Sequence, residues 1–207
     1  SHPEWWASKG YMVIIQDVRG MGASEGVFNG FKQEASDTSE THEWVRSLKE
    51  CNGKLGLYGF SYQGFTQLTG ELNSKPPDCL SPAMTGMNIK DHWCSDGGAY
   101  WWHNNIAWGL QIAALKMKRE NNLFEWEKIR LALENKSYLR EGIDILKKYD
   151  PNSFVLEWLK NLNNARPFEE FKPISTWIKQ PMLIIGGLWD PHLKGAFDLY
   201  KKSKEAG

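Results

Sequence analysis

Two stretches of the sequence set a serine between closely spaced glycines, a pattern typical of a serine that acts as a nucleophile. Residues 22–26 (Gly-Ala-Ser-Glu-Gly) lie in a polar, glycine-rich loop that no helix follows directly. Residues 59–64 (Gly-Phe-Ser-Tyr-Gln-Gly) come directly after an apolar run and directly before a segment of helical pattern. A strand-to-helix turn of this kind exposes a strained serine to an acyl carbon. We therefore predict that Ser61 is a nucleophile; the alternative is an ordinary serine in a glycine-rich turn.

A nucleophilic serine needs a donor for the negative charge that develops on the attacked carbonyl oxygen. The predicted turn places Ser61 at the start of a helix, where backbone amides have no acceptor within the helix. The backbone N–H of Tyr62 is the natural donor to this oxyanion. The predicted chemistry is acyl transfer on esters or amides.

The carboxylate that such a serine also needs is expected just past a later strand, in the chain order serine, acid, histidine. Asp190 meets this expectation, because it follows the apolar run 182–186 in a loop that contains two glycines. We predict that Asp190 is the triad acid. The alternative is that Asp190 caps the helix that starts near residues 191–193.

The histidine is the missing partner. His192 follows the acid, but by only two residues, so it would have to fold back against its own loop. The other histidines precede Asp190 in the chain; they are His2, His42, His92 and His103. We predict that the triad histidine lies outside this chain, that the chain is an internal segment of a longer protein, and that this segment alone is inactive.

The loop around the first glycine-serine stretch has a different expected role. It lacks the Gly-Lys-Ser/Thr ending of a phosphate-binding loop. We expect Arg19 and Glu25 to fix this loop near the Ser61 turn through charge-assisted hydrogen bonds.

Short apolar runs alternate with helical patterns in the first part of the chain. Continuous apolar runs of this length are typical of strands covered on both faces, as in parallel sheets. The predicted strands are residues 11–15, 55–59, 80–84 and 182–186. Helices are predicted between them, over residues 33–49 and 62–72, and after the last of them, over 193–204. This order predicts an α/β fold with a mostly parallel sheet.

The alternation stops between residues 88 and 172, where amphipathic patterns predict helices at residues 124–133, 139–149 and 153–162. We predict an all-helical cap inserted at 88–172 into an incomplete core made of 1–87 and 173–207.

Tryptophan is unusually frequent, with eleven in the chain. Its large apolar body with one donor suits binding clefts and cores alike. Four tryptophans of the predicted cap are candidates for an apolar substrate pocket, with plain packing as an equal alternative: Trp93, Trp101, Trp102 and Trp108.

Composition excludes several classes of function. The 25 basic and 25 acidic residues cancel, so nothing suggests the positive field of a nucleic-acid binder. No apolar run approaches the roughly 20 residues of a membrane span. The three cysteines form neither a disulfide framework nor a metal pair, which favours a reducing, cytoplasmic location. We expect no cofactor and no metal, a small ester or amide as the partner, and leave a homo-oligomer open.

The sequence resembles the cocaine esterase-like (CocE/NonD) hydrolases, the group that also holds the X-Pro dipeptidyl-peptidases. The resemblance rests on the joint presence of the 19–26 loop (Arg-Gly-x-Gly-x-Ser-Glu-Gly) and the 59–64 turn, supported by 97–99 and 186–190. It implies an α/β-hydrolase core with a helical cap, Ser61 as nucleophile and Asp190 as acid.

The resemblance also implies parts that this chain does not hold. Strands and an oxyanion-binding tyrosine would precede residue 1, and the histidine strand and a β-sandwich domain would follow residue 207. Two alternatives stay open: an X-Pro dipeptidyl-peptidase, for which we identify no anchor for the free amine, and a non-catalytic, truncated binding protein on a hydrolase scaffold.

Overall fold

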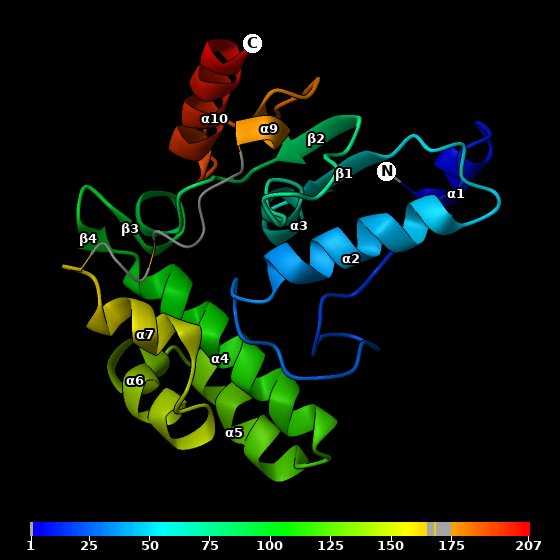
Figure 1. The fold of residues 1–207 in the computed structure, drawn as a ribbon. Helices are drawn as coiled ribbons and strands as arrows, with labels where there is room; N and C mark the ends of the chain where they lie inside the picture. The colour runs from blue at the N-terminus through cyan, green and yellow to red at the C-terminus, as the bar shows by residue number, and fades with distance from the viewer. Residues whose placement is uncertain (1, 165–167, 169–174) are drawn as a thin grey trace. The chain divides into compact units, whose positions relative to one another are not determined.

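The computed structural model describes residues 2–164, 168 and 175–207, and is drawn as a ribbon in Figure 1. It divides into two compact units, one made of Ser1–Met87 and Phe171–Gly207 and the other of Asn88–Glu170. The boundary that the sequence predicts between residues 172 and 173 lies outside the described residues. The division into core and cap stays a prediction.

The first unit combines short helices with a small parallel sheet. Its elements are α1 (Pro3–Ala7), α2 (Glu34–Ser47), β1 (Gly56–Phe60), α3 (Tyr62–Thr66), β2 (Cys79–Ala83), α9 (Ser175–Ile178) and α10 (Leu193–Ala206).

Three parallel segments of chain lie side by side in this unit. β1 pairs with β2 in the register Gly56↔Cys79 to Phe60↔Ala83. Residues 182–185 join the other edge of β2 through two parallel bridges. Figure 1 shows β1 beside β2, with α3 following β1 directly. The predicted α/β class is confirmed, since a parallel order with helices between the strands is the hallmark of that class.

The core of the first unit lies against this sheet. Side chains from β2, from the segment after it, from the turn after α3 and from α10 are buried completely or nearly so, and partly buried side chains of β1 and of residues 182–185 pack against them. The fully packed members are Leu68, Leu80, Met87 and Leu199.

The helix predicted over residues 62–72 is shorter in the structure, where α3 ends at Thr66. Gly70, a poor helix former, lies directly against the Trp177 ring. A Cβ at residue 70 would come within 2.2 Å of a ring carbon of Trp177. The close contact of Gly70 with Trp177, rather than the helical periodicity of the sequence, therefore determines the conformation after Thr66.

The predicted strand at residues 11–15 is wrong. This run pairs with none of the described residues as a strand, and Tyr11 and Ile15 are 61% and 72% exposed. An apolar run predicts burial, but a strand also needs a hydrogen-bonding neighbour. No ladder partner for this run lies in the described part of the chain.

In its described residues, the second unit is helical except for one hairpin. Its elements are the π-helix η1 (Lys90–Cys94), β3 (Ser95–Asp96), β4 (Ala99–Tyr100), α4 (Trp102–Arg119), α5 (Leu123–Glu134), α6 (Tyr138–Tyr149) and α7 (Phe154–Lys160). The predicted helices over 124–133, 139–149 and 153–162 are confirmed as α5, α6 and α7.

The expectation of an all-helical segment is wrong at the hairpin. β3 and β4 pair antiparallel across a two-residue turn. Gly97 and Gly98 both take positive φ, at 56° and 86°. Such a pair of glycines is what a tight hairpin turn requires, so local turn chemistry produced these strands.

The helices of the second unit pack closely at glycines. A Cβ at Gly109 in α4 would come within 2.4 Å of Val155, and one at Gly142 in α6 within 2.3 Å of Ile106. α4 buries Ile106 and Leu110 completely. Among the described helices of both units, none combines the length and apolar character of a membrane span.

Candidate active site

Ser61 lies at the turn between β1 and α3 in a strained conformation. Its φ is 58° and its ψ is −126°, a region that residues with a side chain rarely occupy. Its backbone N–H donates to Ala83 O at 2.9 Å, and its carbonyl accepts from Gly64 N at 2.8 Å and Phe65 N at 3.1 Å. The sharp turn is thus fixed on both sides by backbone hydrogen bonds.

The two glycines around Ser61 are required by close contacts. A Cβ at Gly59 would lie 2.7 Å from Gln63 Cβ, and a Cβ at Gly64 would lie 2.8 Å from Thr85 Cβ. Gly64 is one residue later than in the Gly-x-Ser-x-Gly pattern, so the match is to a variant of that pattern. The structure explains why residue 64 is a glycine, because it packs on Thr85 without room for a Cβ.

Gln67 joins the turn to the sheet, a role that the sequence did not suggest. It is 3% exposed. Its Nε2 donates to the carbonyls of Gly59, Gln63 and Ser81 at 3.0–3.4 Å, and its Oε1 accepts from Ser81 N at 3.0 Å. One buried amide therefore ties β1, α3 and β2 together beside Ser61. No local sequence pattern marks such a residue.

Asp190 lies at the same edge of the sheet as Ser61. Ser61 follows the carboxyl end of β1, and Asp190 follows the carboxyl end of residues 182–185, which run parallel to β1 with β2 between them. Neighbouring strands are about 4.8 Å apart, so roughly 10 Å separates the two outer segments. This edge is where ligands bind in open α/β sheets.

The Asp190 carboxylate uses one oxygen and leaves the other open. Oδ1 accepts from His192 N at 2.7 Å. Oδ2 is buried and has no hydrogen-bond partner among the described residues. The N-cap of α10 is His192, so Asp190 supports the residue before the helix and does not itself cap it.

Two of the five histidines have clear structural roles. His42 is 5% exposed and stacks on the Trp177 ring at 5.4 Å. Burial lowers the pKa of His42 to about 4, so this histidine is neutral at physiological pH. His92 Nδ1 accepts from Asn88 N at 3.1 Å. These contacts account for both residues by packing, and the histidine outside this chain stays a prediction.

The four candidate tryptophans divide into two groups. Trp93 is 4% exposed, and its ring lies 6.0 Å from that of Trp108, which packs on Phe154 at 4.7 Å. Trp101 and Trp102 instead line an open pocket of about 280 Å³ with two following residues of α4. The structure therefore places the first pair in core packing and the second pair at a surface.

The 19–26 loop is anchored by different partners from those expected. Arg19 makes a two-point contact with Asp37 of α2, at 2.9 Å and 2.5 Å. Asp17 accepts from Ala23 N at 3.1 Å and so closes the loop on itself. Glu25 contributes its backbone carbonyl, which accepts from Gly20 N at 2.9 Å. The charge-assisted anchor exists, but it joins the loop to α2.

A buried acidic residue bonded to Tyr62, the residue after Ser61, was not foreseen from the sequence. Glu34, in the first turn of α2, is 2% exposed and accepts from Tyr62 Oη at 2.8 Å and from Gln33 Nε2 at 2.8 Å. Burial raises the pKa of Glu34 to about 7. Its proximity to Tyr62 spans 28 positions of sequence, so no local pattern signals it.

No cluster of three or more His, Cys, Asp or Glu side chains suited to a metal ion occurs in residues 2–164, 168 and 175–207.

The parallel sheet with helices between its strands defines an α/β protein, with a strained serine at one edge of that sheet. Residues 1–207 match the X-Pro dipeptidyl-peptidase (S15 family), and the chain belongs to that family. The chain is also similar to the cocaine esterase of Rhodococcus sp. (strain MB1 Bresler), with 31% identity over 105 residues. The match covers 50% of this chain and 18% of that esterase. The resemblance inferred from the two motifs is confirmed.

Proposed function

We propose that the protein to which this chain belongs is a serine hydrolase that cleaves carboxylic esters or amides through an acyl-enzyme on Ser61. The observation that carries the proposal is the strained Ser61 at a strand-to-helix turn, on the sheet edge that also bears Asp190. The family and the similarity to an esterase support the same class of reaction.

The proposed reaction has two halves. The Ser61 hydroxyl attacks the acyl carbon while a histidine outside this chain takes its proton, and the Tyr62 N–H donates to the oxyanion. The same histidine then returns the proton to the departing alcohol or amine. Water then attacks the acyl-enzyme with the same proton transfers, which releases the carboxylic acid and restores the Ser61 hydroxyl.

Asp190 is proposed to orient that histidine. Its Oδ1 is held by the His192 amide, which fixes the carboxylate plane. None of the described residues donates to its buried Oδ2, and a buried acceptor without a donor is unfavourable. A histidine N–H would supply the missing donor and be held in the tautomer that accepts the serine proton.

We further propose that the first unit is an α/β-hydrolase core and the second unit its cap. This rests on the resemblance to the cocaine esterase-like hydrolases, which implies a helical cap inserted before the strand that bears the acid. Trp101 and Trp102 are proposed to contact the acyl or leaving group, because they line a pocket. Trp93 and Trp108 are proposed to support that cap from within, because they pack in its core.

An X-Pro dipeptidyl-peptidase is the second candidate, favoured by the family that the chain matches. A full-length protein should therefore be tested with p-nitrophenyl esters and Xaa-Pro-anilides side by side. The ratio of the two kcat/KM values decides between the candidates.

A fluorophosphonate probe tests the class itself. We expect it to label the full-length protein and to leave the Ser61→Ala variant unlabelled. A folded full-length protein that resists the probe would instead support the non-catalytic binding protein.

A further inference from the structure

Glu34 is a buried carboxyl that the proposed reaction does not use. Two donors converge on its Oε1, the Tyr62 hydroxyl and the Gln33 amide, both at 2.8 Å. Buried carboxyls are costly unless paired, so a residue of this kind needs a specific reason. The hydrogen-bond donor to Glu34 is Tyr62, which directly follows Ser61 in the chain, and this links Glu34 to the candidate nucleophile.

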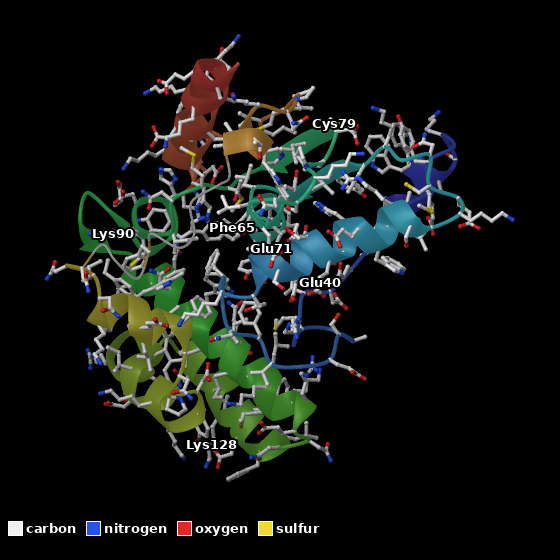
Figure 2. All side chains as sticks on the ribbon, viewed as in Figure 1. Glu40, Phe65, Glu71, Cys79, Lys90 and Lys128 are labelled. Atoms are coloured by element: carbon white, nitrogen blue, oxygen red, sulfur yellow. The ribbon has the colours of Figure 1, made fainter. Side chains whose placement is uncertain are left out.

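The Tyr62 ring is held as firmly as its hydroxyl. It packs on Phe31 at 4.8 Å, on Phe28 at 5.7 Å and on Phe65 at 6.2 Å. Figure 2 shows Phe65 at α3 in the first unit. Phe31 in turn meets the Phe65 ring edge to face at 4.7 Å. The side chain of the residue after the nucleophile is therefore anchored at both the ring and the hydroxyl.

We propose that Glu34 is a positioning residue, which sets the orientation of the oxyanion-binding amide of Tyr62 through the Glu34–Tyr62 side-chain hydrogen bond. The inference rests on the proposed function. The anchored ring and hydroxyl hold the Cα of Tyr62, which is bonded to the amide nitrogen, so loss of the Glu34 bond would let this Cα shift and the N–H rotate. An oxyanion donor must meet the developing charge within a few tenths of an ångström, so such a rotation costs rate.

The charge state of Glu34 can change near neutral pH. Its pKa is about 7, raised by burial first and by Asp37 as well, and lowered by Tyr62, Gln33 and Arg19. Above that pH the carboxylate makes a charge-assisted bond with Tyr62, and below it the bond joins two neutral groups and is weaker. The positioning should therefore be stronger at pH 8.5 than at pH 5.5.

The test is a double-mutant cycle in the full-length protein, with kcat and KM for a p-nitrophenyl ester. Tyr62→Phe and Glu34→Ala should each lower kcat about tenfold and leave KM within about twofold. The double variant should lose no more than the worse single one, because both remove the same bond.

The Glu34→Gln variant tests the pH dependence of kcat, which a purely structural role of Glu34 would not change. It keeps an acceptor for Tyr62 but stays neutral. Its kcat should match the wild type at pH 5.5 and fall about threefold below it at pH 8.5. In the same samples its stability should exceed the wild type at pH 8.5, since no charge is buried. Rate and stability thus move in opposite directions.

A matched control is available in the second unit, where Tyr149 donates to Glu125. Tyr149→Phe removes a tyrosine–glutamate bond of the same kind and should leave kcat unchanged at both pH values.

The outcomes separate the two proposals. If the wild type hydrolyses the ester and Ser61→Ala does not, but Tyr62→Phe and Glu34→Ala act additively or change kcat less than twofold, this inference alone is wrong. If the folded wild type neither turns over the ester nor reacts with a fluorophosphonate, both the inference and the proposed function are overturned.

Discussion

The two glycine-serine stretches share their composition and differ in what surrounds them. The Ser24 hydroxyl donates to Asp17 O at 2.6 Å within a loop that folds on itself. The Ser61 hydroxyl has no hydrogen-bond partner among the described residues, and its backbone is strained. The strand before and the helix after Ser61 hold that strain in place. Flanking elements, rather than glycine spacing, therefore distinguish a candidate nucleophile from a structural serine.

The largest expected effect is the difference in kcat between variants of the two serines. In the full-length protein, Ser61→Ala should lower kcat by at least about 10³-fold, because it removes the attacking oxygen. Ser24→Ala loses one loop hydrogen bond and should leave kcat within about twofold. Rates with a p-nitrophenyl ester measure both. Equal losses in the two variants would show that the flanking elements do not matter.

The second effect is the difference in kcat between variants of Asp190, on the sheet edge of Ser61, and of Asp17, in the loop of Ser24. Asp190→Asn should lower kcat on the order of 10³-fold while the protein stays folded, because an amide cannot hold the histidine in the required tautomer. Asp17→Asn still offers an acceptor oxygen to the Ala23 amide but weakens that bond by removing the charge, so it should lower the melting temperature slightly and leave kcat nearly unchanged. Asp190 would be a structural residue only if its variant kept the wild-type rate.

A third, smaller effect is the difference in stability between variants of one glycine from each stretch. Gly64→Ala should destabilise the protein by about 2–3 kcal/mol, because its Cβ would press on Thr85 and on a backbone carbonyl. Gly22→Ala places a Cβ against the flexible end of Asp17 at a positive φ, and should cost about 1 kcal/mol. Urea unfolding measures both, and fluorophosphonate labelling should slow only for Gly64→Ala.

The smallest expected effect concerns the pH dependence of stability through Glu34. Its pKa rises from 4.5 to about 7 on folding, so the folded form binds the proton more tightly. The stability it contributes is present below pH 4.5 and lost as the pH rises towards 7. Urea unfolding should find Glu34→Gln about 1–2 kcal/mol more stable than the wild type at pH 8.5. The two should agree closely at pH 4, and a difference that does not vary with pH would contradict the burial of a charge.

Sequence patterns predicted the parts of the fold that depend on local order. The apolar run before Ser61 became β1, and the run before Asp190 became the segment bridged to β2. Residues 11–15 show the limit of this reasoning, because apolar character predicts burial but does not supply a pairing partner. The pair Gly97 and Gly98 is typical of a tight hairpin turn, but the helical patterns around it favoured the prediction of helices.

The candidate site was predictable where motifs are contiguous and not where contacts are distant. Ser61, Tyr62 and Asp190 were predicted from short motifs together with the apolar runs that directly precede them. Glu34 and Gln67 act through side chains that reach across the fold, and neither glutamate nor glutamine has a local pattern for such a role. Long-range hydrogen bonds of this kind become visible only with coordinates.

Trp177 has a consequence for how the first unit is held together. It is fully buried, it covers Gly70, and it stacks on His42. All three belong to the first unit, although the chain runs through the whole second unit between Gly70 and Trp177. Trp177 therefore packs the chain that returns from the second unit against residues that precede that unit.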